Sequence, residues 1–312
     1  MSSRITLRQL HVFVAVARSG SVSAAARELG LSQSATSQAL TEFERQLGVS
    51  VAERLGRRLE LNAVGQRLLS RAEQLLDDVD LFESEAREPD GPLSGELRLS
   101  ASATVGSYLM PSIIGGFTAR YPDVRLDLKL RNTYEVIDSV RRFEADLGLI
   151  EGICHHRELI SVPWQEDRLV IIAAPDHPLA ATPNVSAQAL SDADWVLREE
   201  GSGTRAVFEA AIHDRLGRLN IRLELGQHEA IKQAVRAGLG LGCLSELAVR
   251  EELEQGTLVE LCLDGLSLKR HFYMVWHASR YRSPVWQAFK VHLDEIDHAG
   301  RAPFSPPYTA GS

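Results

Sequence analysis

The sequence has few cysteines and no long hydrophobic run, and each absence excludes a class of protein. The three cysteines are odd in number and lack a Cys-x-x-Cys spacing, which excludes a disulfide scaffold and favours reduced thiols in a cytoplasmic protein. No apolar run approaches the roughly 18 residues that a membrane-spanning helix needs. The apolar stretch at 11–17 is too short for a secretory signal. We therefore expect a cytoplasmic chain with no membrane partner.

The N-terminal segment is basic although the chain as a whole is acidic. The 312 residues carry a net charge of −8, with 44% hydrophobic and 24% charged residues. The length predicts two or three globular domains. Residues 1–65 contain eight Arg, no Lys and five Glu, a net charge of +3. A basic head on an acidic body is compatible with a nucleic-acid partner.

Three short helices with capping residues are predicted within this basic segment. Thr6, Ser21 and Ser32 precede periodic stretches at 7–18, 22–29 and 33–46. The last two stretches are joined by a tight turn at Gly30, which indicates a helix-turn-helix.

The third predicted helix and the segment after it carry candidate DNA contacts. The helix opens with short polar side chains that suit base edges and phosphates, namely Gln33, Ser34, Thr36, Ser37 and Gln38. Residues 54–61 indicate a two-strand wing whose arginines suit phosphates, namely Arg54, Arg57 and Arg58. The alternative is a surface helical hairpin with solvated arginines. We favour double-stranded DNA as the partner.

Residues 23–48, SAAARELGLSQSATSQALTEFERQLG, closely resemble the winged helix-turn-helix of LysR-type transcriptional regulators, and the resemblance continues to Gly65. The sequence departs from that pattern at Ser34, often Pro in the family, at 51–52, usually Leu-Phe, and at 62–65. The departures affect packing and capping rather than DNA contacts. The resemblance implies a regulator rather than an enzyme.

A long helix capped by Asn62 is predicted to run to about residue 86. Its apolar residues recur in steps of three and four, at 65, 68, 72, 75, 79 and 82. This heptad seam favours dimerisation, while packing on its own domain is the alternative. The resemblance also implies a homodimer or a homotetramer. We expect a DNA-binding domain at 1–61 and a linker helix at 62–88.

The remainder predicts an α/β fold. Strands alternate with helices between 93 and 298, which indicates a mainly parallel sheet. They include a helix over 104–121 and a strand over 169–174. The resemblance implies a two-lobed effector domain similar to periplasmic binding proteins. Lobe one would comprise 93–163 and 268–298, lobe two 164–267, and residues 299–312 a flexible tail.

Polar residues follow several predicted strands of this body, where ligands of α/β proteins bind. Two strand-to-helix junctions offer hydroxyls and free N–H groups that can hold an anion: Ser100, Ser102 and Thr104 in one, and Ser202, Gly203, Thr204 and Arg205 in the other. Asn132, Thr133 and Glu151 end two further strands, and Glu229 opens a helix. Glu151 and Glu229 would repel an anion unless each were paired with arginine or protonated. Facing each other across a cleft, as the resemblance implies, the junctions favour a small carboxylate or oxyanion as effector.

Some stretches are similar to one branch of the family, the YeiE-type regulators and their neighbours in sulfur and carbon-fixation control. They include residues 150–156, 201–205 and 229–235. This similarity implies a small inorganic anion such as sulfite or sulfate.

Other motifs are set aside. The glycines of 238–242 leave a predicted helix and enter a strand, the reverse of a dinucleotide loop. Cys154, His155 and His156 are adjacent, and adjacent residues rarely converge on one metal. We expect no metal, no cofactor and no catalytic set. The rival hypothesis is a cytoplasmic solute-binding or enzymatic α/β protein whose N-terminal helices serve dimerisation only.

Overall fold

The computed structural model describes residues 5–55, 58–87, 92–182 and 184–300. The chain divides into two compact units, one of residues 1–92 with 142–144 and one of 93–141 with 145–312. Each unit is built around hydrophobic clusters of its own. No described helix is long and apolar enough to cross a membrane.

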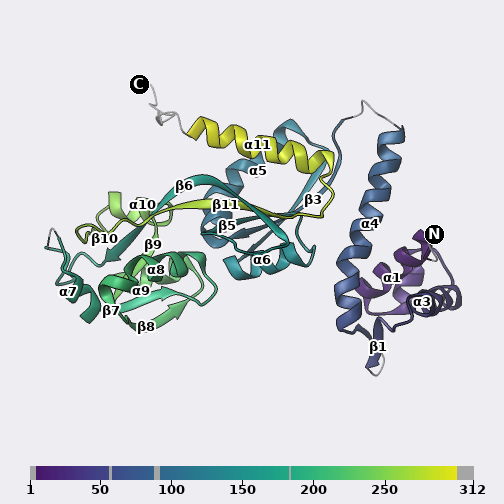
Figure 1. The fold of residues 1–312 in the computed structure, drawn as a ribbon, viewed down its shortest axis with the longest axis horizontal. Coiled ribbons are helices and arrows are strands. Elements are labelled where there is room, and N and C mark those ends of the chain that lie inside the picture. The colour runs from purple at the N-terminus through teal and green to yellow at the C-terminus, as the bar shows by residue number, and fades with distance from the viewer. Residues whose placement is uncertain (1–4, 56–57, 88–91, 183, 301–312) are drawn as a thin grey trace. The chain divides into compact units, whose positions relative to one another are not determined.

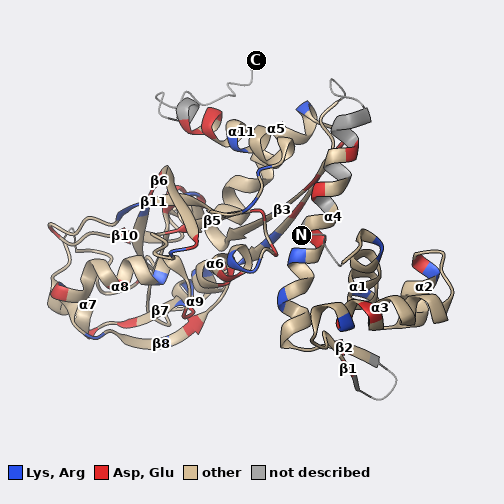
Figure 2. Ribbon diagram, turned by 45° about the vertical axis from the view of Figure 1, so that its right-hand side comes forward, with Lys and Arg blue, Asp and Glu red and all other residues tan. Residues whose placement is uncertain are grey.

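The N-terminal unit is a winged helix-turn-helix followed by a long helix. Its elements are α1 Leu7–Ser19, α2 Val22–Glu28, α3 Gln33–Leu47, β1 Ala52–Leu55, β2 Arg58–Leu61 and α4 Ala63–Arg87 (Figure 1). The predicted caps are confirmed, since the hydroxyls of Thr6, Ser21 and Ser32 accept the backbone N–H of the residue three positions later. Basic and acidic positions occur together on α2 and α3 (Figure 2).

Aromatic stacking joins the first and third helices. The rings of Phe13 and Phe43 stack with their centroids 5.0 Å apart, and both are buried. Strands β1 and β2 pair antiparallel, which gives the hairpin predicted for the wing. Arg57 and the side chains of Arg54 and Arg58 lie outside the described part of the structure.

The apolar seam of α4 divides between two environments. Ala72 and Leu76 are buried in the core of the N-terminal unit, and Leu68 packs against that core. Leu75 and Phe82 are 52% and 72% exposed. The seam therefore packs partly on its own unit, the alternative considered above, and leaves large apolar side chains exposed.

The second unit has one twisted sheet in the order β4-β3-β5-β11-β6-β9-β7-β8, with β10 added to β6. The strands are β3 Gly95–Ser102, β4 Val124–Arg131, β5 Leu147–Glu151, β6 Leu159–Ala173, β7 Asp194–Arg198, β8 Asn220–Leu225, β9 Leu241–Ser245, β10 Val259–Leu261 and β11 Lys269–His277. The helices are η1 Val105–Leu109, α5 Met110–Arg120, α6 Thr133–Arg141, α7 Ala187–Asp192, α8 Gly203–Leu216, α9 His228–Arg236, α10 Glu246–Glu254 and α11 Pro284–Gly300.

Two long strands join two lobes. Strands β3, β4 and β5 pair parallel in lobe one, and β7, β8 and β9 pair parallel in lobe two. Strands β6 and β11 pair antiparallel with each other and run between the lobes (Figure 1). Each lobe buries its own apolar residues against its helices. The two-lobed α/β architecture is as predicted.

Three predicted elements need correction. The helix expected over 104–121 is split into the π-helix η1 and α5, with Pro111 in the first turn of α5, because proline cannot donate the backbone bond that a continuous helix needs. The strand expected from 169 begins at Leu159. Pro163 is accommodated there beside a register shift in β11 between His271 and Tyr273. The final helix reaches Gly300, and residues 301–312 of the expected tail lie outside the described residues.

Candidate functional site

A groove in the N-terminal unit lies between the start of α1 and the first turns of α3. Its volume is about 830 Å³, and its lining includes Ser34, Ser37 and Gln38. Gln33 and Ser34 are exposed, as is Gln38. Arg8 also lines the groove, although nothing in the sequence distinguishes it from the other basic residues. The groove thus brings three predicted DNA contacts beside an unpredicted cation.

Thr36 does not belong to this exposed face, and the prediction that it contacts DNA is corrected. Its side chain is completely buried, and its hydroxyl donates to the carbonyl of Ser32 at 3.0 Å. The reason is helical geometry, because Thr36 lies four residues before Leu40 on the face that packs into the core.

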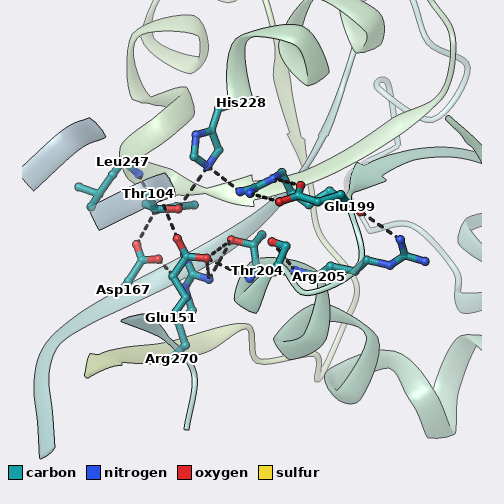
Figure 3. Close-up of polar contacts among 12 residues, drawn as sticks. Thr104, Glu151, Asp167, Glu199, Thr204, Arg205, His228, Leu247 and Arg270 are labelled. Carbon is teal, nitrogen blue, oxygen red and sulfur yellow. Dashed lines mark hydrogen bonds and ion pairs between the residues drawn. The ribbon is translucent and has the colours of Figure 1, made fainter. Parts of the chain in front are cut away.

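A buried polar network joins the two lobes of the second unit. We define the interlobe cluster as Thr104, Glu151, Asp167, Arg198, Thr204, His228 and Arg270 (Figure 3). The cluster lies where β5 ends and where η1 and α8 begin, so helical N–H groups converge on it.

The Glu151 carboxylate bridges both lobes. One oxygen accepts the backbone N–H of Thr104 at 3.0 Å, and the other accepts the N–H and hydroxyl of Thr204 at 3.0 and 2.8 Å. Arg270 Nη1 lies 3.5 Å from that second oxygen. Burial alone would raise the pKa of Glu151, but Arg270 and the two threonines outweigh burial and lower the pKa to about 2. Glu151 is therefore ionised and paired with arginine. This pairing is one of the two conditions under which Glu151 would not repel an anion.

Arg270 is the hub of the cluster. Its Nε donates to Asp167 at 2.7 Å, and its Nη1 donates to the Thr204 hydroxyl at 3.1 Å. Asp167 also accepts a hydrogen bond from Ser245 at 2.7 Å. Because Asp167 lies on β6 and Arg270 on β11, the pair fastens the two connecting strands together. Neither residue was singled out from the sequence, because each lies among other polar residues, Asp167 within 165–168 and Arg270 within 269–271.

His228 is a neutral acceptor on the lobe-two side. Its Nε2 lies 3.3 Å from both Thr104 Oγ1 and Arg198 Nη1, and Arg198 also forms two 2.8 Å hydrogen bonds with Glu199. Burial, then the charge of Arg198, lowers the pKa of His228 to about 4. An imidazole that accepts from a guanidinium must be unprotonated at that nitrogen.

We expect acid to weaken the fold through His228. Its folded pKa lies below the ordinary value of 6.5, so the unfolded chain binds more protons, and stability is lost as pH falls from about 6.5 toward 4. The loss at pH 5 is about 2 kcal/mol. Urea unfolding at pH 7.5 and 5.0 should show this drop in the wild type and a smaller one in His228→Asn. His213→Asn, at an exposed histidine, is the matched control; equal drops in all three proteins would contradict the prediction.

Apart from Arg205 and Glu229, the other predicted effector residues divide into three groups. The hydroxyls of Ser100, Ser102 and Thr133 are buried and have no hydrogen-bond partner among the described residues. Ser202 caps α8, and an added Cβ at Gly203 would overlap the carbonyl oxygen of Glu151. Asn132 caps α6 by accepting the N–H of Glu135 at 2.9 Å.

Arg205 and Glu229 remain predicted effector residues, and Arg205 reaches the cluster through its Nη1, which donates to the backbone carbonyl of Arg198 at 3.1 Å. The guanidinium of Arg205 bonds Glu209 at 2.8 Å and Glu224 at 3.0 Å, and Figure 3 shows it pointing away from Glu151. The Glu229 side chain is 64% exposed and pairs with Lys232 at 3.0 Å. Each lies on a helix whose start reaches the cluster, but the Glu229 side chain is exposed, whereas the Arg205 side chain is only 11% exposed.

Comparison with known proteins matches both parts of the chain. Residues 7–66 match the family described as bacterial regulatory helix-turn-helix protein, lysR family, and residues 90–296 match the LysR substrate binding domain. The HTH-type transcriptional regulator YeiE of Escherichia coli is 42% identical over 290 residues, which cover 93% of this chain and 97% of that protein.

Solved structures agree in fold. A full-length OxyR variant from Pseudomonas aeruginosa, 24% identical, superposes with a TM-score of 0.74 and covers 95% of both chains. The CcmR regulatory domain of Synechocystis in complex with 2-PG is 33% identical with a TM-score of 0.61, covering 65% of this chain and 98% of that domain.

Proposed function

The chain belongs to the LysR family of bacterial DNA-binding transcriptional regulators, and on this premise we propose that a small anion bound between the lobes controls how it occupies DNA. Its named relatives are regulators and not enzymes, as the sequence indicated. In this proposal residues 1–61 read double-stranded DNA, 62–88 join copies into a homodimer or homotetramer, and 93–298 hold the effector of a cytoplasmic protein.

The observation that carries the proposal is the Glu151 carboxylate, held by N–H groups of Thr104 in one lobe and Thr204 in the other. Donors that hold a carboxylate suit a free carboxylate or a small oxyanion such as sulfite or sulfate equally well. The unpartnered hydroxyls of Ser100, Ser102 and Thr133 supply further donors. The similar CcmR domain, known with 2-PG, supports effector binding by this type of domain.

The mechanism follows from competition for these donors. A free anion that takes the Thr104 and Thr204 N–H groups displaces Glu151 and takes its place beside Arg270. The lobes then close on a free ligand instead of on a side chain attached to β5. The equilibrium between lobe arrangements therefore shifts by the difference between the interaction free energies of the ligand and of the Glu151 side chain. Two DNA-reading heads joined through α4 can transmit that shift as a change in operator binding.

Thermal melting against sulfite, sulfate, thiosulfate, phosphate and simple carboxylates tests this proposal. A selective anion at about 100 times its Kd should stabilise the protein by about 2.7 kcal/mol. Thr204→Val, which removes a donor hydroxyl, should lose this response while retaining operator binding. Thr182→Val, at an exposed threonine of the same unit, should respond like the wild type. No response to any anion, or an undiminished response in Thr204→Val, would contradict the proposal.

A further inference from the structure

The start of α1 carries donor groups that no described residue satisfies. The hydroxyl and carbonyl of Thr6 accept the N–H groups of Gln9 and Leu10. The N–H groups of Leu7 and Arg8 have no acceptor among the described residues, as expected for the first turn of a helix. The helix has 13 residues and no acidic residue in its first turn, so the positive end of its dipole is not neutralised there. This end of α1 therefore suits an anion.

The side chain of Gln9 adds a fixed donor at the same end of α1. Its Oε1 accepts the backbone N–H of Thr6 at 2.8 Å and the Thr6 hydroxyl at 3.1 Å. Because a backbone N–H can only donate, this contact identifies the amide oxygen and directs the NH₂ group away from the Thr6 N–H. Gln9 is only 8% exposed, and it lines the groove between α1 and α3. Its NH₂ group has no acceptor among the described residues and is not one of their fully buried unpartnered atoms, so it remains accessible from the groove.

The groove beside these donors carries an unbalanced positive charge. Its charged lining residues are Arg8 and Glu42. The carboxylate of Glu42 is neutralised by Arg45, whose Nε and Nη2 donate to its two oxygens at 2.7 and 2.5 Å. The exposed side chain of Arg8 has no acidic partner among the described residues. The groove therefore attracts an anion, and in a DNA-reading head the anion at hand is a backbone phosphate.

We propose that Arg8, the Gln9 NH₂ group and the first N–H groups of α1 bind one phosphate of the DNA backbone, next to the bases that α3 reads. We name these groups the α1 phosphate seat. Ser34, Ser37 and Gln38 of α3 line the same groove, which places the seat beside predicted base contacts. The proposal rests on DNA binding by this family and does not depend on the proposed anion.

The seat and the wing lie at opposite ends of α1. Leu59 of β2 donates its N–H to the carbonyl of Gly20, the residue that follows α1. The 13 residues of α1 span about 20 Å. Phosphate contacts at both ends of this helix fix the orientation of the head on the duplex, and they position α3 without reading sequence themselves.

Arg8→Ala tests the seat through the salt dependence of DNA binding by the full chain, measured by fluorescence anisotropy. Affinity for any duplex should fall about fivefold per head at 0.15 M salt, and the slope of log affinity against log salt should become shallower by about 0.9 per head. Arg8→Lys should keep the slope because it keeps the charge. Arg18→Ala, on the same helix, is the control because Arg18 pairs with Glu73. An unchanged slope in Arg8→Ala would overturn the seat, whereas a wild type that binds no duplex would contradict DNA binding itself.

Gln9→Glu tests the amide donor without removing the helix cap. Glutamate at this position preserves the capping box, but it replaces the NH₂ donor by a carboxylate oxygen that repels phosphate. DNA binding should weaken about tenfold per head, while circular dichroism and the melting temperature stay as in the wild type. Gln66→Glu makes the same charge change at an exposed position of α4 outside the groove, and should weaken binding less than about twofold. Equal binding by the wild type and Gln9→Glu would overturn the proposal.

Ethylation interference on operator DNA separates a phosphate contact from a structural role of Arg8. Ethylating the phosphate that the seat binds should weaken binding by the wild type but not by Arg8→Ala, because the variant no longer contacts that phosphate. If the same phosphates interfere equally with both proteins, Arg8 contacts none of them and the proposal is overturned.

Discussion

Replacing Arg270 by methionine is expected to lower the free energy of unfolding of the second unit by about 3–5 kcal/mol. The variant leaves the carboxylates of Glu151 and Asp167 buried, each at most 2% exposed at the side chain, without the cation between them. Removing the partner of a buried charge is among the most destabilising changes to a folded protein. The loss should be partly recovered in Arg270→Met/Asp167→Asn, which removes one of the charges.

Urea unfolding followed by tryptophan fluorescence measures this effect in the right part of the molecule, because all four tryptophans lie in the second unit, at positions 164, 195, 276 and 286. Arg125→Met is the matched control: that side chain is 81% exposed, and its loss should change stability by less than about 0.5 kcal/mol. A loss below about 1 kcal/mol in Arg270→Met would show that the cluster does not depend on its arginine. If Arg270→Met does not fold, Arg270→Lys should give an intermediate loss, because it keeps the charge but not the planar fork.

The double variant Arg57→Ala/Arg58→Ala is expected to weaken DNA binding about 30-fold per DNA-reading head at 0.15 M salt, whatever the sequence of the DNA. Each phosphate contact releases about 0.9 counterion, so the slope of log affinity against log salt should become shallower by about 2 per head. The expectation rests on the sequence, in which Arg57 lies between the ranges of β1 and β2 and Arg58 is the first residue of β2.

Fluorescence anisotropy with one operator and one unrelated duplex, at several salt concentrations, measures this slope. Arg18→Ala removes one positive charge from α1, where Arg18 pairs with Glu73 at 2.9 Å, and should leave the slope unchanged. Gln38→Ala, at an exposed position of α3, should instead narrow the difference between operator and unrelated DNA. An unchanged slope in the arginine double variant would refute the wing assignment.

The helix-turn-helix was predictable because its signals are local. Caps at Thr6, Ser21 and Ser32 depend on side chains that bond backbone groups three residues away. The face that each residue occupies was less certain. Thr36 has the chemistry of a DNA contact but sits one turn from Leu40 on the buried side of α3. The polar character of a side chain alone therefore could not show that Thr36 is buried while Ser37 and Gln38 line the groove.

The interlobe site was predictable in part. Strand ends and helix starts follow from periodicity, and the resemblance to LysR-type regulators implied that Thr104, Glu151 and Thr204 face one cleft. Their partners could not be predicted, because Arg270 is 119 positions from Glu151 in the sequence and meets it only after β11 inserts between β5 and β6. Pro163 similarly concealed the first half of β6, since only the register shift opposite it makes a proline tolerable there.

The sequence alone determined the helix-turn-helix, the α/β class and the kinds of donor at the ends of the strands, because capping, periodicity and turn chemistry act over a few residues. The tertiary structure alone decided how those donors are used. It turned Glu151 from a group expected to repel anions into the carboxylate that bridges the lobes, and it paired Arg205 with Glu209 and Glu229 with Lys232. The physical reason is that the charge state and direction of a side chain depend on what packs around it, and in this protein the decisive neighbours come from strands far apart in the chain.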